Sequence, residues 1–426
     1  MMMKKIKYIT SHPFFASSAV MVIGSNFANF LAFVYHLIIG RLLGPIHYGE
    51  LAAVISLATM FSAIFTFLSM VVIKFASSAK SKNEENYIFS WFNRKSFAIA
   101  STLLVLTLIL SPVFSRFLNV ELKSIFVVPF FLFFSLLSLV LRAFLQGILK
   151  FNQMVVSLNV ELLLRLILGV LLVYLGFSVF GAVLGIVISG IIGFFITLYF
   201  LKGYTFFSKD KKININREIF SYTLPAFIFS LTSTSFLTTD ILLAKHFIGP
   251  HDAGIYASLS TLGRIILFGT APIGAVMFPM ISKKFSRGQK YLGIFFVSLL
   301  LTFVASIVVL VFYKFLPDVA IKTLYGNGFL GGDKYLIWFG LFAAIYSLTS
   351  LICSFYLSIN KVKVVILPLI FSIFQIIGIF IFHDSILTII KVSLLSAILL
   401  LVSLLIYFGY ETYNFSKSSL NRNSSL

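Results

Sequence analysis

The chain has few acidic residues, one cysteine and no long polar stretch. Of its 426 residues, 13 are Asp or Glu and 11% are charged, whereas soluble proteins carry about 25% charged residues. Because Cys353 is the sole cysteine, an internal disulfide is excluded. No segment is polar enough to form a separate soluble domain. With 60% hydrophobic residues, the composition indicates a polytopic membrane protein.

Several motifs of soluble chemistry are also missing. The sequence has no GxxxxGK[ST] loop, no HExxH, no DxD and no Cys/His cluster at metal-binding spacing. A self-contained ATP-driven pump is therefore excluded, and we predict no catalytic residue, no cofactor and no metal site. Gly326, Gly328 and Gly331 match GxGxxG, but no strand–helix unit surrounds them, so we do not interpret them as a dinucleotide site.

Apolar runs of roughly 20 residues, the length that crosses ~30 Å of hydrocarbon, recur along the whole chain. The first run, between Lys7 and Arg41, is too long for a signal peptide, whose apolar region has about 7 to 15 residues. We predict an all-α polytopic membrane protein with about 12 transmembrane helices. The expected spans are 13–40, 51–78, 96–117, 124–148, 154–176, 179–201, 219–244, 254–282, 291–316, 335–358, 362–382 and 386–410.

A short turn motif occurs twice, 205 residues apart. GRLLGPIHYGE begins at Gly40, and KHFIGPHDAGIYA begins at Lys245. Pro fixes φ and Gly permits positive φ, as a tight turn between two helices requires. The repetition predicts two six-helix repeats in a two-lobe transporter. The expected domains are an N-terminal lobe at 1–203, a cytoplasmic linker at 204–217, a C-terminal lobe at 218–410 and a cytoplasmic tail at 411–426.

Basic residues are distributed unevenly between the predicted loops. Of 33 Lys and Arg residues, 21 fall in segments on the side of the N-terminus and seven in the opposite loops. Cytoplasmic loops carry an excess of Lys and Arg, so we predict a multi-pass protein of the cell membrane with both termini in the cytoplasm. The net charge of +20 then reflects topology and contact with membrane lipids, and nucleic acid is not an expected partner.

Three basic residues inside the spans have no carboxylate nearby in sequence. Intramembrane charges usually face a water-filled cavity or one another. Arg142, Arg264 and Lys74 therefore suggest a cationic cavity for an anionic head group, to which Arg offers a bidentate fork. The alternative is pairing between helices, for example of Arg264 with Asp240.

Glu161 and Arg165 lie four residues apart, on one face of a helix. One interpretation is a pair that neutralises itself inside the bundle. The other places Arg165 in the cationic cavity and Glu161 on a polar path that couples transport to an ion.

Polar side chains recur at corresponding places in the first and seventh spans. Asn26, Asn29 and His36 share roughly one face of the first span, and Thr234 and Asp240 belong to a polar stripe in the seventh. These residues suit a water-accessible path between lobes. The alternative is hydrogen bonding between packed helices.

Four stretches resemble one family of transporters. GRLLGPIHYGELA, SYTLPAF, DILLAKHFIGPHDAGIYASLSTLGR and VMFPMISKKFS are similar to segments of oligosaccharide flippases in the multidrug, oligosaccharidyl-lipid and polysaccharide exporter superfamily. The resemblance implies a two-lobe transporter that alternates between inward and outward openings. Its cargo would be a polyprenyl-diphosphate-linked oligosaccharide, moved from the cytoplasmic to the outer leaflet for cell-surface polysaccharide synthesis. The cationic central cavities of the family match Arg142, Arg264 and Lys74 by residue type only.

Two other functions stay open. A multidrug exporter coupled to H⁺ or Na⁺ would use Asp240 as its coupling carboxylate, although drug-extruding relatives often carry an acidic residue in the first span, and this span has none. A membrane-embedded polysaccharide polymerase or ligase would need a sizeable outer loop, and the longest expected one is about 316–334. We therefore expect a transporter and not an enzyme, with H⁺ or Na⁺ as candidate coupling ions and polysaccharide assembly enzymes as candidate partners.

Overall fold

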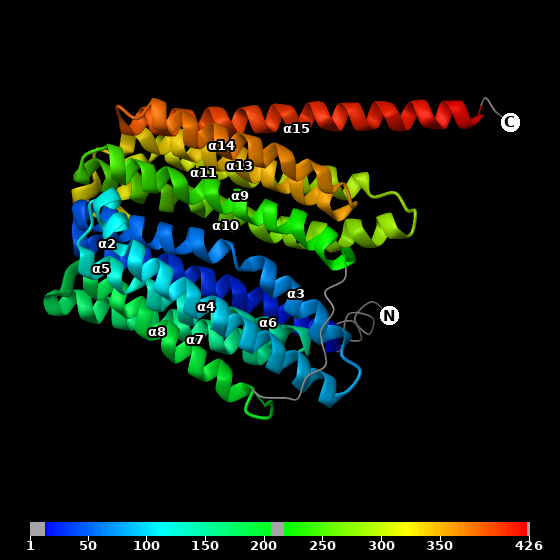
Figure 1. Cartoon of the computed structure of the whole chain (residues 1–426). Helices are drawn as coiled ribbons and strands as arrows, with labels where there is room; N and C mark the ends of the chain where they lie inside the picture. The colour runs from blue at the N-terminus through cyan, green and yellow to red at the C-terminus, as the bar shows by residue number, and fades with distance from the viewer. Residues whose placement is uncertain (1–12, 206–216, 424–426) are drawn as a thin grey trace, which may run out of the picture. The chain divides into compact units, whose positions relative to one another are not determined.

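The computed structural model describes residues 13–205 and 217–423, and these residues form helices almost throughout, with no strand among them (Figure 1). In chain order the elements are α2 (Pro13–Ala63), α3 (Thr66–Ser78), α4 (Lys82–Leu118), α5 (Leu122–Phe126), α6 (Val128–Gly147), α7 (Phe151–Leu172), the π-helical η1 (Val173–Phe177), α8 (Ser178–Phe200), α9 (Arg217–Phe247), α10 (Pro250–Ser286), α11 (Leu292–Phe315), α12 (Pro317–Leu324), the 3₁₀-helix η2 (Asn327–Phe329), α13 (Asp333–Ser358), the 3₁₀-helix η3 (Val362–Val365), α14 (Ile366–Ile381) and α15 (Ile386–Asn423).

Ten helical stretches of the described chain are long and apolar enough to cross a membrane. One of them, Ile23–Ala63, holds the first predicted span and the start of the second, because α2 is kinked at Gly44, where φ is +69°. Nδ1 of His36 lies 3.2 Å from the hydroxyl of Tyr48, whereas twelve residues of straight helix would separate them by about 18 Å. The chain therefore reverses at the predicted turn.

A second stretch, Phe151–Phe200, holds the fifth and sixth predicted spans. It changes direction through η1, where Gly176 and Ser178 have positive φ. Each predicted span overlaps a helix of the structure, so the expected all-α multi-pass fold is confirmed. The last helix, α15, continues to Asn423, beyond the predicted end at 410.

Two compact units make up the chain. Unit 1 comprises Met1–Phe227, Gly249–Ser258 and Lys322–Phe329, and unit 2 comprises Ile228–Ile248, Leu259–Ile321 and Leu330–Leu426. Unit 1 thus includes two short segments from the second half of the sequence. The expected lobe boundaries stay a prediction, and most of the expected linker, at 206–216, lies outside the described residues.

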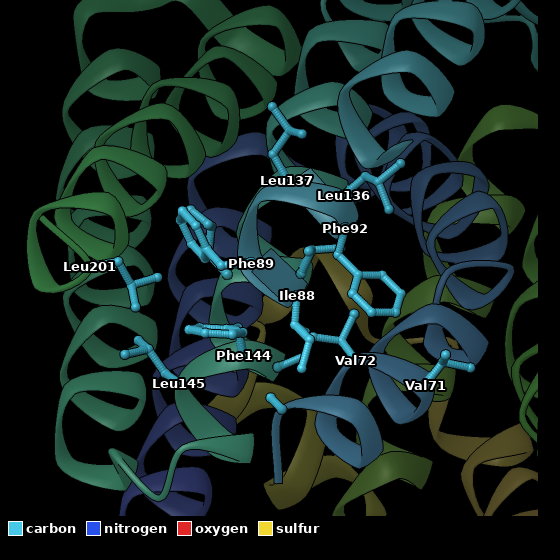
Figure 2. Close-up of a cluster of buried hydrophobic side chains, with 14 of the residues drawn as sticks. Val71, Val72, Ile88, Phe89, Phe92, Leu136, Leu137, Phe144, Leu145 and Leu201 are labelled. Atoms are coloured by element: carbon cyan, nitrogen blue, oxygen red, sulfur yellow. The ribbon is translucent and has the colours of Figure 1, made fainter. Parts of the chain in front are cut away.

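The interior of unit 1 contains a cluster of aromatic and branched side chains (Figure 2). Phe89 of α4 and Phe144 of α6 have ring centroids 5.1 Å apart, and Leu145, Val72 and Leu201 are buried in the same cluster. Lipid tails are as apolar as these side chains, so close van der Waals packing, and not exclusion from water, favours this association.

Tyr204 completes the cluster with a polar contact. Its ring lies 5.5 Å from Phe89 and 5.1 Å from Phe144, while its hydroxyl donates to Oε2 of Glu85 at 2.6 Å. Nζ of Lys82 is 3.7 Å from the ring centroid, within the range of a cation–π contact. Burial and the hydrogen bond to Glu85 raise the pKa of Tyr204 above its ordinary value. Sequence reasoning did not identify this group of residues.

The Gly44 turn of unit 1 contacts the last turn of α12 and Tyr325, which follows it. Nε of Arg41 donates to the carbonyl of Leu324 at 3.1 Å, and Nη2 donates to those of Lys322, at 3.4 Å, and Thr323. The hydroxyl groups of Tyr48 and Tyr325 are hydrogen-bonded to each other at 3.0 Å. A guanidinium at the carbonyl end of a helix satisfies acceptors that have no partner within the helix.

Unit 2 is held by hydrogen bonds from buried side chains to neighbouring helices. The Tyr313 hydroxyl of α11 donates to the Leu262 carbonyl of α10 at 2.7 Å. Gln375 of α14 donates through Nε2 to Ser393 Oγ of α15 at 2.9 Å. Such bonds between helices are worth about 0.6 kcal/mol each in a membrane protein.

We expect Tyr204→Phe to lower the free energy of unfolding by about 1 to 2 kcal/mol, because it removes a hydrogen bond to a carboxylate and keeps the aromatic packing. Denaturant titration of the purified protein, followed by circular dichroism, measures the change. Tyr199→Phe is the matched control, since Tyr199 is 63% exposed and should change stability by less than about 0.5 kcal/mol. Equal stability of both variants would contradict a role of the Glu85 contact.

Candidate functional site

Arg142 is bound to two residues of the neighbouring helix. From α6, its Nε donates to Oγ of Ser157 at 3.1 Å and its Nη2 donates to the Ser157 carbonyl at 3.3 Å, both on α7. The same Nη2 lies 2.5 Å from Oε2 of Glu161. The partner of Arg142 is therefore a carboxylate 19 residues away, which its own neighbourhood in the sequence did not indicate.

This contact also decides between the interpretations of Glu161 and Arg165. Glu161 pairs with Arg142 and not with Arg165, so the expectation of a self-neutralising pair on one helix is wrong. Adjacent helices approach closely enough for a cross-helix ion pair, and the rotation of α7 about its axis points the carboxylate at α6.

Arg165 instead lies over an aromatic ring. Its guanidinium carbon is 4.5 Å from the ring centroid of Tyr35, which is fully buried and donates its hydroxyl to the Ala182 carbonyl at 3.1 Å. Among the described residues Nε of Arg165 has no hydrogen-bond partner. The side chain also lines a small pocket of about 60 Å³ with Thr59 and apolar residues. The Nε donor of Arg165 is therefore free to bond a ligand.

A larger pocket of about 310 Å³ lies beside the Arg142–Glu161 pair. Its polar lining consists of Ser69, Ser135, Ser138, Arg142, Gln146 and Glu161. Ser138 is only 2% exposed, and its Oγ has no hydrogen-bond partner among the described residues. The pocket thus combines one charged pair with hydroxyl and amide groups, the kinds of donor and acceptor that recognise phosphates and polyols.

The role of the polar residues of α2 in a water-accessible path stays a prediction. Asn26 and Asn29 are exposed. His36 is half-buried and contacts Tyr48 beyond the turn, so it belongs to the contacts of that turn.

In α9 the hydroxyl groups are largely bonded within the helix. Thr238 donates to the carbonyl of Thr234 at 2.7 Å, Thr232 donates to that of Ile228 at 2.9 Å, and Ser235 pairs with Thr239 at 3.0 Å. These bonds favour the alternative in which the α9 stripe supports packed helices. Thr234 itself is half-buried.

The other expected charges do not line this pocket. Asp240 of α9 is fully buried, and its Oδ1 accepts from the Ile241 amide at 2.9 Å. Nη2 of Arg264 donates to the Leu237 carbonyl at 2.8 Å, one turn before Asp240. Lys74 of α3 is exposed and does not line the pocket. The structure therefore brings Arg142 and Glu161 together in unit 1 and places Arg264 and Asp240 in unit 2.

Comparison with solved structures identifies the fold. A multidrug resistance MATE family transporter of the MOP superfamily aligns with a TM-score of 0.72 and 16% identity, over 88% of this chain and 94% of that one. The lipid II flippase MurJ aligns with a TM-score of 0.72 and 16% identity, over 92% of this chain and 87% of that one. A MOP superfamily transporter from Pyrococcus furiosus aligns with a TM-score of 0.64 and 16% identity, over 92% and 95%.

Sequence comparison identifies the family. The uncharacterized membrane protein MJ1375 of Methanocaldococcus jannaschii is 26% identical in an alignment of 286 residues that covers 62% of this chain and 67% of that protein. The sequence profile described as polysaccharide biosynthesis protein matches residues 14–285, well over half of the chain. With its many apolar helices and the fold of MOP superfamily transporters, this multi-pass membrane protein belongs to the polysaccharide biosynthesis protein family.

Proposed function

We propose that the chain is a flippase that moves a polyprenyl-diphosphate-linked oligosaccharide from the cytoplasmic to the outer leaflet of the cell membrane. Its family and its likeness to a lipid II flippase support this function. The observation that carries the proposal is an excess of positive charge inside unit 1, where α6 and α7 hold Arg142 and Arg165 against one carboxylate. A charge within the membrane is costly unless it serves a ligand or a partner.

In this mechanism the two arginines bind the diphosphate and the pocket hydroxyl groups bind sugar. The polyprenyl tail stays in the lipid, because moving a long apolar chain from hydrocarbon into water is unfavourable. Alternating access moves the head group across, with H⁺, Na⁺ or the membrane potential as the driving force. Both termini face the cytoplasm, and the enzymes that build the oligosaccharide act on that side.

A cation-coupled multidrug exporter is the second candidate. Two observations favour it: the fully buried carboxylate of Asp240 and the likeness of the fold to a multidrug resistance transporter. This function predicts dye transport driven by an ion gradient.

We expect purified protein in liposomes to accelerate the transfer of a fluorescent polyprenyl-diphosphate oligosaccharide between leaflets. Arg165→Ala should slow transfer at least tenfold, because a hydrogen bond between charged groups is worth about 1.5 to 3 kcal/mol. Arg165→Lys should be intermediate, since it keeps the charge without the fork. An impermeant quencher added outside reports the labelled lipid in the outer leaflet.

The matched control for this assay is Arg116→Ala, which removes an exposed arginine from the end of α4. It should transfer the lipid at the wild-type rate. A transfer rate with wild-type protein that is no higher than in empty liposomes, with and without an ion gradient, would contradict the flippase proposal. Dye efflux that needs an ion gradient and disappears in Asp240→Asn would establish the exporter in its place.

The contacts of Arg41 generate a second test, on alternating access. Gly49 and Ala253 lie close together in unit 1, which also contains Arg41 and the carbonyls that it binds. We expect Arg41→Ala to loosen this end of the unit, because three hydrogen bonds from a charged donor are lost. In a Cys353→Ser background, Ala253→Cys should then react with an impermeant maleimide several-fold faster than without the Arg41 substitution. The Arg116→Ala control should leave the labelling rate unchanged, and an unchanged rate in Arg41→Ala as well would contradict the role of Arg41.

A further inference from the structure

Ser157 fixes the orientation of Arg142 through one side of its guanidinium. Nε and Nη2 make all of its hydrogen bonds to Ser157 and Glu161, and Nη1 makes none within the described part of the chain. The side chains of Arg142 and Glu161 are 13% and 17% exposed. The pair is thus held between α6 and α7 with one nitrogen left for a further acceptor.

One face of α6 carries polar groups that line the same pocket as Arg142. Ser135, Ser138, Arg142 and Gln146 follow one another at intervals of three or four residues, so they lie in one row along the helix. All four line the 310 Å³ pocket. The hydroxyl of Ser138 is buried and has no partner among the described residues. A bound ligand would satisfy it.

The carboxylate of Glu161 fits because residue 193 has no side chain. A Cβ atom at Gly193 of α8 would lie 2.5 Å from Oε2 and 2.9 Å from Cβ of Glu161. Any larger residue would therefore displace the carboxylate from Arg142.

Few ionisable groups surround Glu161. Arg142 is the single charged residue of α6, Tyr199 is the single ionisable one of α8, and the exposed Lys74 is the single charged one of α3. On α7, Arg165 lies over Tyr35 of α2. The remaining ionisable residues of α2 lie at or near its turn, namely His36, Arg41, His47, Tyr48 and Glu50. Glu161 is therefore the ionisable group whose protonation most directly changes the charge next to Arg142.

We propose that Glu161 is a protonatable placeholder in a phosphate subsite at Arg142. As a carboxylate, Glu161 forms an ion pair with the guanidinium of Arg142. When Glu161 takes up one proton from water, its negative charge is lost and a phosphate oxygen of the ligand replaces it, so that the arginine has an anionic partner in both states. Ser135, Ser138 and Gln146 then contact the group attached to the phosphate.

This inference rests on the proposed function only for the source of the phosphate, a diphosphate head group of a lipid. A free phosphate compound carries the same chemistry. Because the proton must arrive before the phosphate binds, affinity should rise as the pH falls. The phosphate itself loses charge over the same range, which opposes the effect, so a gain at low pH has to come from the protein.

Calorimetric titration of the full-length protein in nanodiscs tests the placeholder, with inorganic diphosphate and farnesyl diphosphate as probes at pH 5.5 and 7.5. We expect wild type to bind about tenfold more tightly at pH 5.5. Glu161→Gln should bind more tightly than wild type at pH 7.5 and should not gain affinity at pH 5.5, and Arg142→Ala should not bind detectably. Glu121→Gln, which removes an exposed carboxylate paired with Lys123, is the matched control and should behave as wild type.

Gly193→Ala supplies an independent arm, because it displaces the Glu161 carboxylate without altering it. We expect tighter diphosphate binding at pH 7.5 than in wild type, whereas a purely structural role of the ion pair predicts weaker binding. Weaker binding in both Gly193→Ala and Glu161→Gln, or an unaltered pH dependence in Glu161→Gln, would overturn the inference.

The two probes separate this inference from the proposed function. Farnesyl diphosphate that binds at least tenfold more tightly than inorganic diphosphate supports the lipid source, and equal affinities overturn that source in favour of a free phosphate compound. If the protein does not transfer the lipid but binds diphosphate more tightly at pH 5.5, the flippase proposal is contradicted and the phosphate subsite is supported. If lipid transfer holds while Glu161→Gln keeps the wild-type pH dependence of binding, the placeholder falls and the flippase stands.

Discussion

The constraint on which the structure depends is that polar groups inside hydrocarbon must find partners within the protein. Water is absent there, so an unsatisfied donor or acceptor costs several kcal/mol. The hydroxyl groups of α9 meet this constraint by bonding to carbonyls of their own helix. Tyr313 and Gln375 meet it by bonding to a neighbouring helix. Against this background, the exceptions in unit 1 become informative.

Three polar side chains of this kind lie on α6 and α7. Among the described residues, one nitrogen of Arg142 and the hydroxyl of Ser138 have no partner, and Arg165 lies over the ring of Tyr35. Ser96, Ser124 and Thr302 also have buried hydroxyl groups without a partner among the described residues, so what distinguishes Arg142 and Ser138 is the pocket that both of them line. The same reasoning explains why the α9 stripe, which is richer in hydroxyl groups, is the weaker candidate.

The sequence predicted most of the fold and less of the site, for one physical reason. Apolar runs and the Gly-Pro turns depend on local geometry, so the spans and the reversal at Gly44 could be predicted from spacing alone. The partner of Glu161 depends on the rotation of α7 against α6, and the i, i+4 rule pointed to Arg165 in error. The contact of Arg41 with carbonyls near Leu324 joins residues more than 280 positions apart, which spacing does not reveal.

The length of α15 has a consequence for whatever is attached to the end of the chain. Its 38 residues extend about 57 Å at 1.5 Å per residue, whereas the hydrocarbon layer is ~30 Å thick. Figure 1 shows α15 as one continuous helix, and its length exceeds the thickness of the hydrocarbon layer by about 27 Å. A helix of this kind is a stiff spacer, so a domain or label fused after it stands off the bilayer at a nearly fixed height.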